Sequence, residues 1–153
     1  MQHTKIDWGL KNFYTWNPIT GCTFGCEYCY ARKIAMRFSG HFKPTFLKDR
    51  LEDPSKLKKP ANIFVCSMGE IYDPKVKKEW RVEVWKAIER AMWHRYYILT
   101  KQPQNIIQEE LPKNIWIGVS ITKKEDLWRI QKLKDICNIK RFVSFEPLLE
   151  RIY

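Results

Sequence analysis

Short apolar runs alternate with segments of helical spacing along this chain, and this alternation restricts the fold more than any other feature. The runs predicted as strands are residues 16–20, 62–66, 96–100, 115–121 and 141–145. The segments predicted as helices are residues 30–38, 74–95, 103–111 and 124–136, with a long connection at 41–60. Strands that alternate with helices predict βαβ units and a parallel sheet. We therefore expect an α/β fold with about five parallel strands, in one domain over residues 1–153.

Polar residues follow each of the five predicted strands. They are the cysteine-bearing loop at 21–30, the run Ser67, Met68, Gly69 and Glu70, the run Thr100, Lys101 and Gln102, Ser120, and the pair Ser144 and Glu146. In parallel α/β folds the chemistry gathers at the carboxyl ends of the strands. We therefore expect these side chains to share one site at the mouth of a partial barrel.

Three of the five cysteines, Cys22, Cys26 and Cys29, lie within eight residues of one another. Three thiolates on a short loop are typical of a metal or iron–sulfur site. Structural zinc usually takes four ligands in two separated pairs, and this chain has no second pair. A [4Fe–4S] cluster with one iron left open suits three thiolates better, because the open iron can bind a small molecule. Zinc and unliganded thiols remain the alternatives.

The charge is strongly positive, with 28 Lys and Arg against 17 Asp and Glu for a net +11. This excess favours a polyanionic partner such as nucleic acid, although a solvated surface explains a spread charge equally well. No apolar run approaches the ~18 residues of a membrane-spanning helix, and the first residues form no secretory signal. We expect a cytoplasmic protein that does not enter a membrane.

The cysteine spacing C-x3-C-x2-C and six ordered blocks connect the sequence to a known family. The blocks are TWNPITGC (15–22), CEYCYA (26–31), FVCSMGE (64–70), LTK (99–101), IWIGVS (115–120) and RFVSFEPLL (141–149). The sequence resembles a radical-SAM-like family found in phages, bacteria and archaea, whose members are usually described as phage proteins of unknown function. The blocks follow the family's order and span nearly the whole chain.

The resemblance implies a partial (β/α) barrel that holds a [4Fe–4S] cluster and S-adenosylmethionine. Cys22, Cys26 and Cys29 would bind three irons, and the methionine part of the cofactor would chelate the fourth. The resemblance places Ser67, Met68, Gly69 and Glu70 near the cofactor's amino group, Ser120 near its ribose and Tyr28 near its adenine. The reaction it implies is reductive cleavage of the cofactor to a 5′-deoxyadenosyl radical, which abstracts hydrogen from a substrate. A flavodoxin- or ferredoxin-like protein would donate the electron.

Two departures from the family pattern affect these expectations. Relatives usually continue beyond the fifth strand into a sixth, whereas this chain stops at Tyr153. A missing strand leaves an unpaired edge, which a second copy of the chain could cover. A naturally short member and an incomplete relic are the other interpretations. Glu70 replaces a common Asp, which keeps the carboxylate, and Asp73 replaces a frequent His, which removes an acid/base group.

Several of these residues also have a purely structural interpretation. Lys101 is either a substrate contact or a solvated strand-end lysine, and Glu146 either contacts a ligand or caps a turn. A turn explains a serine at a strand end, such as Ser120, as well as a cofactor contact does. We interpret Cys66 and Cys137 as structural, and Trp80, Trp85 and Met92 as core residues of the helix at 74–95.

The sequence therefore predicts a radical SAM enzyme whose substrate it does not identify, with nucleic acid as one candidate. The alternative is a non-catalytic module that binds an iron–sulfur cluster or zinc, with or without nucleic acid.

Overall fold

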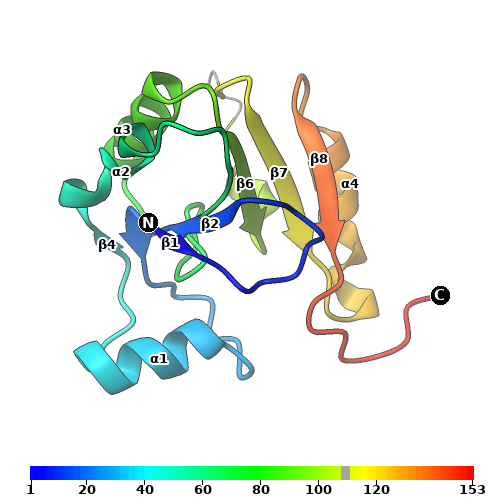
Figure 1. Ribbon diagram of the computed structural model, residues 1–153. Helices are drawn as coiled ribbons and strands as arrows, with labels where there is room; N and C mark the ends of the chain where they lie inside the picture. The colour runs from blue at the N-terminus through cyan, green and yellow to red at the C-terminus, as the bar shows by residue number, and fades with distance from the viewer. Residues whose placement is uncertain (108–110) are drawn as a thin grey trace.

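The computed structural model describes residues 1–107 and 111–153, which form a mixed α/β fold around a six-stranded sheet (Figure 1). The strand order is β1-β2-β5-β6-β7-β8. The strands are β1 (Gln2–His3), β2 (Phe13–Trp16), β5 (Asn62–Val65), β6 (Arg95–Thr100), β7 (Ile115–Ser120) and β8 (Lys140–Ser144). β1 pairs with β2 in the antiparallel sense, and every other neighbouring pair is parallel. A mostly parallel sheet is confirmed, and four of its strands lie where the sequence predicted them. The first parallel strand, β2, lies at 13–16 rather than 16–20, and β1 is an addition.

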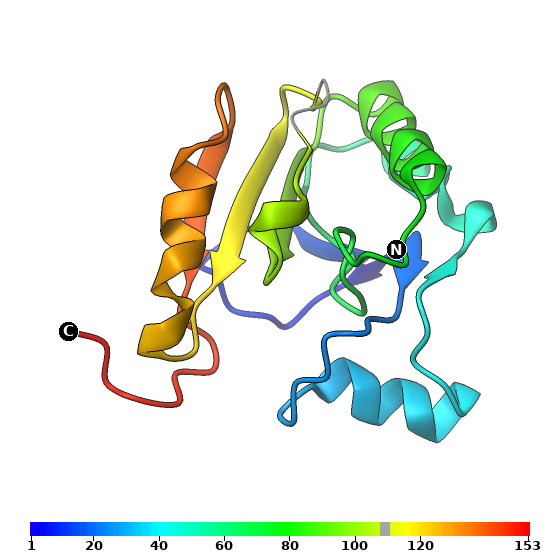
Figure 2. The same cartoon turned by 180° about the vertical axis from the view of Figure 1, so that it is seen from behind.

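The helices lie mainly on one face of this sheet. They are α1 (Tyr30–Ser39), α2 (Asp53–Lys56), α3 (Lys78–Arg90) and α4 (Trp128–Lys134), with the 3-10 helices η1 (Lys48–Arg50), η2 (Pro103–Asn105) and η3 (Lys124–Leu127). A small second sheet pairs β3 (Ile19–Thr20) with β4 (Thr45–Phe46). Seen from behind, α3 and α4 stand over the sheet, whereas α1 projects away below it (Figure 2). The opposite face of the sheet is crossed by the N-terminal segment that joins β1 to β2 (Figure 1).

Side-chain alternation along the strands explains the two faces. In β6, Tyr96 and Ile98 are fully buried in the main apolar core beside Val84 and Ile88 of α3. Tyr97, one residue along, instead contacts aromatic rings on the other face, including Trp8 of the N-terminal segment. The sheet is therefore covered by helices on one side and by aromatic side chains on the other.

Two predicted elements have different boundaries in the structure. The run at 16–20 is divided between β2 and β3, because Asn17 and Pro18 interrupt it and proline cannot donate a backbone hydrogen bond. The helix predicted at 74–95 begins only at Lys78 and ends at Arg90. Ala91 leaves the helical conformation, with φ −126° and ψ 54°, so the four-residue spacing no longer places Met92 on the buried face. Met92 is 64% exposed, and its prediction as a core residue was wrong.

The remaining elements agree with the sequence to different extents. The segment at 124–136 divides into η3 and α4, and the connection at 41–60 contains β4, η1 and α2. The helix predicted at 103–111 is a 3-10 turn over Pro103–Asn105, and part of it, residues 108–110, lies outside the described residues. Cys66 is buried as predicted, whereas Cys137 is exposed, so its structural role is not borne out.

The sheet is open at both edges in the described part of the chain, because β1 and β8 each have a strand neighbour on one side only. A partial barrel stays a prediction. No helix within residues 1–107 and 111–153 has both the length and the apolarity needed to cross a lipid bilayer.

Candidate functional site

One pocket of about 700 Å³ is lined by eleven of the residues that the sequence singled out for a site, whereas Thr100, Gln102 and Ser144, expected at the same site, do not line it. These lining residues are Cys22, Cys26, Tyr28, Cys29, Ser67, Met68, Gly69, Glu70, Lys101, Ser120 and Glu146. They come from loops that follow β3, β5, β6 and β8 and from the last residue of β7. Parallel strands bring their carboxyl ends to the same edge of a sheet, which is why residues so distant in sequence meet here.

The cysteine loop and the loop after β5 are joined directly through their backbones. Gly21 and Gly69 form a parallel β-bridge, in which Gly21 N–H donates to Met68 O at 2.9 Å and Glu70 N–H donates to Gly21 O at 3.1 Å. A Cβ at Gly69 would lie 2.9 Å from Gly21 O, and one at Gly21 would lie 2.1 Å from Lys43 O. Glycine at position 69 therefore permits the close approach of the two loops, and glycine at position 21 permits the approach of the segment before β4.

Side chains reinforce this junction on both sides. The buried carboxylate of Asp73 accepts two hydrogen bonds from Thr23 of the cysteine loop, one from its N–H and one from its hydroxyl, each at 2.7 Å. Asn17 Oδ1 accepts the Met68 N–H at 2.8 Å and the Ser67 hydroxyl at 3.3 Å. Asp73 thus holds the cysteine loop in a structural role, and Asn17 is a pocket-lining residue that the sequence did not single out for the site.

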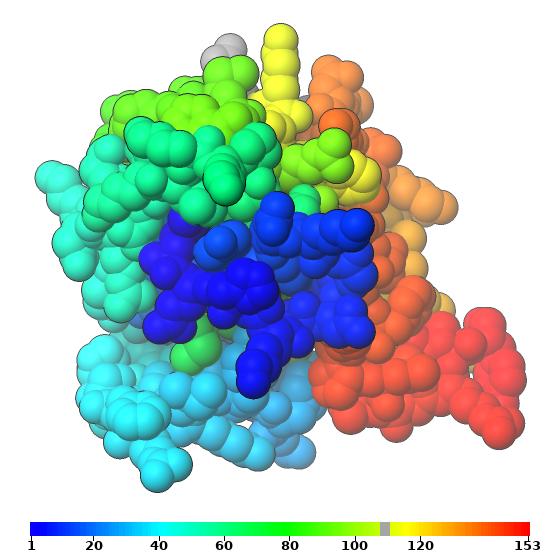
Figure 3. Space-filling model, in the orientation of Figure 1, coloured from blue at the N-terminus to red at the C-terminus, as the bar shows by residue number. Residues whose placement is uncertain are grey.

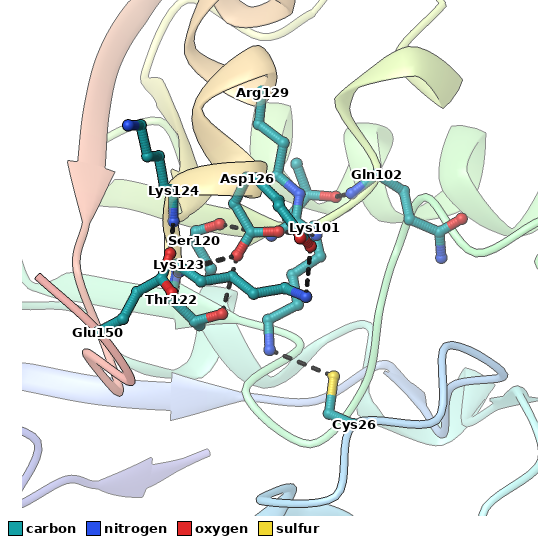
Figure 4. Close-up of polar contacts among 12 residues, drawn as sticks. Cys26, Lys101, Gln102, Ser120, Thr122, Lys123, Lys124, Asp126, Arg129 and Glu150 are labelled. Carbon is teal, nitrogen blue, oxygen red and sulfur yellow. Dashed lines mark hydrogen bonds and ion pairs between the residues drawn. The ribbon is translucent and has the colours of Figure 1, made fainter. Parts of the chain in front are cut away.

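Each of the three cysteine sulfurs accepts a hydrogen bond. Cys22 Sγ accepts from the Phe24 N–H at 3.3 Å, and Cys29 Sγ accepts from the Arg32 N–H at 3.3 Å. Cys29 is the N-cap of α1, where the helix dipole favours a thiolate. Cys26 Sγ accepts from Lys101 Nζ at 3.3 Å (Figure 4). Each sulfur therefore has one hydrogen-bond donor that favours negative charge on it.

The surroundings of the Cys22 thiol affect its protonation. Burial, together with the carboxylates of Glu70 and Asp73, raises the pKa of the Cys22 thiol to about 12, although the bond from Phe24 acts in the opposite direction. The Cys22 thiol is accordingly protonated at neutral pH in the free protein. Because a thiolate is the ligand form, metal binding at Cys22 must release this proton.

Lys101 joins β6 to the cysteine loop. Its ammonium group donates to the Tyr28 hydroxyl at 2.7 Å and lies 4.4 Å from the centre of the Tyr28 ring. Burial alone would lower the pKa of Lys101, but the hydrogen bonds from its ammonium group to Tyr28 and Cys26 outweigh burial and raise it. Lys101 therefore remains a cation inside the pocket, half-buried rather than solvated as a strand-end lysine would be.

Glu70 is nearly fully buried and its carboxylate is held by the chain itself. Oε1 accepts from the Thr100 hydroxyl at 2.8 Å and from the Tyr72 N–H at 3.1 Å, while Oε2 accepts from the Lys101 N–H at 3.0 Å. Burial raises the pKa of the Glu70 carboxyl, and these three hydrogen bonds partly oppose that rise. Glu70 thus fastens the loop after β5 to the end of β6 while it lines the pocket.

A buried ion pair supports the far wall of the pocket near Ser120 (Figure 4). Arg129 Nη2 lies 2.8 Å from Asp126 Oδ1, and Arg129 Nη1 donates to Ser120 O at 2.8 Å. The same guanidinium lies 5.6 Å from the ring centre of Phe24, in the cysteine loop. The sequence pattern did not reveal this pair, and its one sequence signal was the place of Asp126 in the first turn of a helix, three residues after the N-cap Lys123.

The cysteine sulfurs are the candidate ligands for a bound metal group. Among residues 1–107 and 111–153, no three His, Cys, Asp or Glu side chains are grouped closely enough to hold one ion. In an iron–sulfur cluster each cysteine binds a different iron, so its ligands need not meet at one point. Cys22, Cys26 and Cys29 could hold such a cluster, with Lys101 and the backbone N–H groups of Phe24 and Arg32 as outer hydrogen-bond donors.

Comparison with known proteins identifies one family. A family described as "Protein of unknown function (DUF5131)" matches residues 3–153, nearly the whole chain. No curated protein and no solved structure matches the chain significantly.

Proposed function

The chain belongs to the DUF5131 family of unknown function, and on this premise we propose from its own site that it is a radical SAM enzyme. In this proposal Cys22, Cys26 and Cys29 hold a [4Fe–4S] cluster, and the rest of the pocket binds S-adenosylmethionine. The observation that supports the proposal most strongly is that the three cysteines line the same pocket as polar residues from four other strand ends. If the three cysteines served only to stabilise the fold, the protein would not need an accessible pocket beside their thiols.

The pocket has the size and polarity of a ligand site. Its volume of about 700 Å³ lies within the range of pockets that bind cofactors and drug-sized molecules, ~300–1,000 Å³. Apolar side chains such as Phe64 and Leu99 form part of its wall, and a few polar groups converge on it. This combination supports binding of a cofactor with both an aromatic base and charged groups.

The bound cluster and cofactor would supply an electron and a cleavable sulfonium bond. The chain's own residues would hold them in place. Lys101 keeps a positive charge beside Cys26 and offsets the charge of the ligand sulfur. The Gly21–Gly69 bridge fixes the cysteine loop against the Ser67–Glu70 segment, so the cluster ligands and the proposed cofactor-binding loop cannot move apart independently. The pocket residues Tyr28 and Ser120 are proposed contacts for adenine and ribose.

Reductive cleavage of S-adenosylmethionine tests the proposal. The full chain, reconstituted with iron and sulfide under anaerobic conditions and reduced with dithionite, should form 5′-deoxyadenosine and methionine. Cys26→Ala should abolish this reaction, whereas Cys137→Ala, a change at an exposed cysteine away from the pocket, should not. A reconstituted wild-type chain that binds the cluster without cleaving the cofactor would instead support a non-catalytic iron–sulfur module. A colourless chain with one zinc would contradict both.

The reaction needs a one-electron donor, and we assign that role to a flavodoxin- or ferredoxin-like protein. Oxidation of such a donor in the presence of the reconstituted chain and S-adenosylmethionine, measured by its absorbance, checks this part separately. A homo-oligomer that covers the open edge at β8 belongs to the same proposal and is checked by light scattering.

A further inference from the structure

A second pocket of about 650 Å³ lies on the aromatic face of the sheet, between the amino ends of β6 and β7 and the carboxyl end of β8. Its walls are aromatic, and the sequence analysis did not assign it. Trp8, Tyr97, Trp116 and Phe142 line it together with Arg95 and Glu146. Trp8 and Glu146 also line the first pocket, so the two pockets share a wall. In Figure 3 the N-terminal segment that carries Trp8, in blue, borders the residues near β8 on this face.

Strand register places the aromatic side chains in one row. Phe64, Tyr97, Trp116 and Lys140 are successive partners across β5, β6, β7 and β8, so their side chains point to the same side of the sheet. The rings of Tyr97 and Trp116 are stacked, with centres 5.9 Å apart and planes 30° apart. The Lys140 ammonium lies 5.5 Å from the Trp116 ring centre. At the β8 end of this row, the Lys140 ammonium therefore lies over the ring of Trp116, which is only partly buried.

Gly118 makes room for one wall of this pocket, the Phe142 ring. A Cβ at Gly118 would lie 2.5 Å from the Phe142 ring, which therefore occupies the space that any other residue's side chain would fill. Trp8 packs against the same ring, with centres 5.5 Å apart. The rings of Phe142 and Trp8 thus line the pocket beside Trp116 and leave space between them and Trp116.

The charges at the rim are positive and unneutralised. Neither Arg95 nor Lys140 forms an ion pair with a carboxylate within the described residues, and both are exposed. Glu146 is the one acidic residue of the described chain that lines the pocket, and it lies after β8 on the wall shared with the first pocket. An occupant with an aromatic ring and an adjacent anion matches this arrangement. The net charge of +11 extends the same preference to a polyanion.

We propose that this second pocket binds one nucleotide of a single-stranded nucleic acid, with its base among Trp8, Trp116 and Phe142 and its phosphate at Lys140 and Arg95. Stacking on aromatic rings combined with backbone cations is how proteins bind single strands without reading sequence. The inference stands on this pocket's own residues and does not require a cluster in the first pocket. Its consequence, that the bound strand presents a neighbouring nucleotide to the first pocket, rests on the proposed function.

The test is the affinity of the full chain for a fluorescently labelled single-stranded DNA of about 12 nucleotides, measured by anisotropy. Trp116→Leu should weaken binding by about 5- to 100-fold, since base–aromatic stacking contributes ~1–3 kcal/mol per base. Trp116→Phe should restore most of it, which separates loss of stacking from loss of folding. Trp93→Leu, at an exposed tryptophan outside both pockets, should bind as the wild type does.

Charge and ligand source are tested in the same assay. Lys140→Gln should lower the slope of log affinity against log salt by about 0.7, the value for one phosphate contact to a single strand, and Lys132→Gln on α4 should not.

Unlabelled AMP should compete only weakly, because it lacks the flanking phosphates. Strand binding that Trp116→Leu leaves unchanged would overturn the proposal, as would absence of strand binding by the wild type. AMP that binds as tightly as the strand would also overturn it, in favour of a free nucleotide. Because binding is measured without reconstitution, none of these results bears on cofactor cleavage.

Discussion

The ammonium group of Lys101 lies 3.3 Å from the sulfur of Cys26, a residue 75 positions away in the sequence. This contact connects the end of a core strand of the sheet to the loop that carries all three clustered cysteines. It also places a permanent positive charge, raised in pKa, next to a sulfur that we propose as a cluster ligand.

Replacement of Lys101 by Gln should weaken retention of iron without unfolding the chain. The substitution removes a charge-assisted hydrogen bond to Cys26 Sγ, and loss of such an outer-shell partner typically lowers metal affinity by about 10- to 100-fold. Iron per chain after a timed challenge with a chelator measures the effect. Lys86→Gln, at an exposed lysine of α3, is the matched control and should retain iron like the wild type. Equal retention by Lys101→Gln and Lys86→Gln would show that the contact has no such role.

Replacement of Asp73 by Ala should destabilise the fold and free the cysteine loop. The change leaves the N–H groups of Thr23 and Lys75 without the acceptor that Asp73 provides. Since a hydrogen bond to a charged group contributes ~1.5–3 kcal/mol, we expect a loss of about 2–4 kcal/mol in the free energy of unfolding. Urea denaturation measures it, with Asp49→Ala at an exposed position as the control. A loss no larger than that of the control would contradict the role assigned to Asp73.

Substitution of Gly69 by Ala should separate the two loops of the first pocket. The added Cβ would meet Gly21 O at 2.9 Å and Gly21 N at 3.0 Å, both backbone atoms. We expect a destabilisation of about 1–3 kcal/mol and a lower iron content after reconstitution. Gly40→Ala, at the end of α1 with nothing within 4 Å of its added Cβ, strains only the backbone and should keep the iron content. A full iron content in Gly69→Ala would show that the cysteine loop does not depend on this junction.

Stability should fall as the pH drops below about 6.5, the ordinary pKa of histidine, because of His94. Burial lowers the pKa of His94, although hydrogen bonds to backbone oxygens act in the opposite direction. Its Nδ1 accepts the Ala61 N–H at 3.1 Å, so the neutral ring is the form that fits. The unfolded chain therefore binds this proton more readily than the folded chain. The contribution of neutral His94 to stability is complete above the pKa of His94 in the unfolded chain. As the pH falls, this contribution decreases until the pH passes the lowered pKa of His94 in the folded chain.

Unfolding by urea at about pH 7.5 and about pH 5.5 measures this effect. His94→Gln should be less stable at both values but should show a smaller difference between them than the wild type. His41→Gln, at an exposed histidine, should reproduce the wild-type difference. The same pH difference in all three proteins would rule out His94 as its source.

The alternating pattern of the sequence was sufficient to predict the central strands β5 and β7, because each buries an apolar run in the core. Asn62–Val65 and Ile115–Ser120 lie almost where the pattern placed them. Boundaries that depend on tertiary contacts were less accurate. The long helix ended early at Arg90, where no glycine or proline marks the end, and Met92 became exposed in consequence.

The site residues were predictable because they follow strands, and the ends of parallel strands converge. Sequence spacing could not show which of them hold the chain together. Asp73 and Asn17 act through contacts with residues about 50 positions away, and Arg129 reaches the cysteine loop from α4. The aromatic row of the second pocket depends on strand register, which appears only when the strands are paired.

Iron and sulfide analysis with electron paramagnetic resonance tests the central claim most directly. We predict about four irons per chain after anaerobic reconstitution, as one cubane cluster requires. The spectrum of the reduced protein should change on addition of S-adenosylmethionine, and both results should disappear in Cys26→Ala but persist in Cys137→Ala. Zinc in place of iron, or a cluster whose spectrum does not respond to S-adenosylmethionine, would contradict the assignment of Cys22, Cys26 and Cys29 to a radical SAM site.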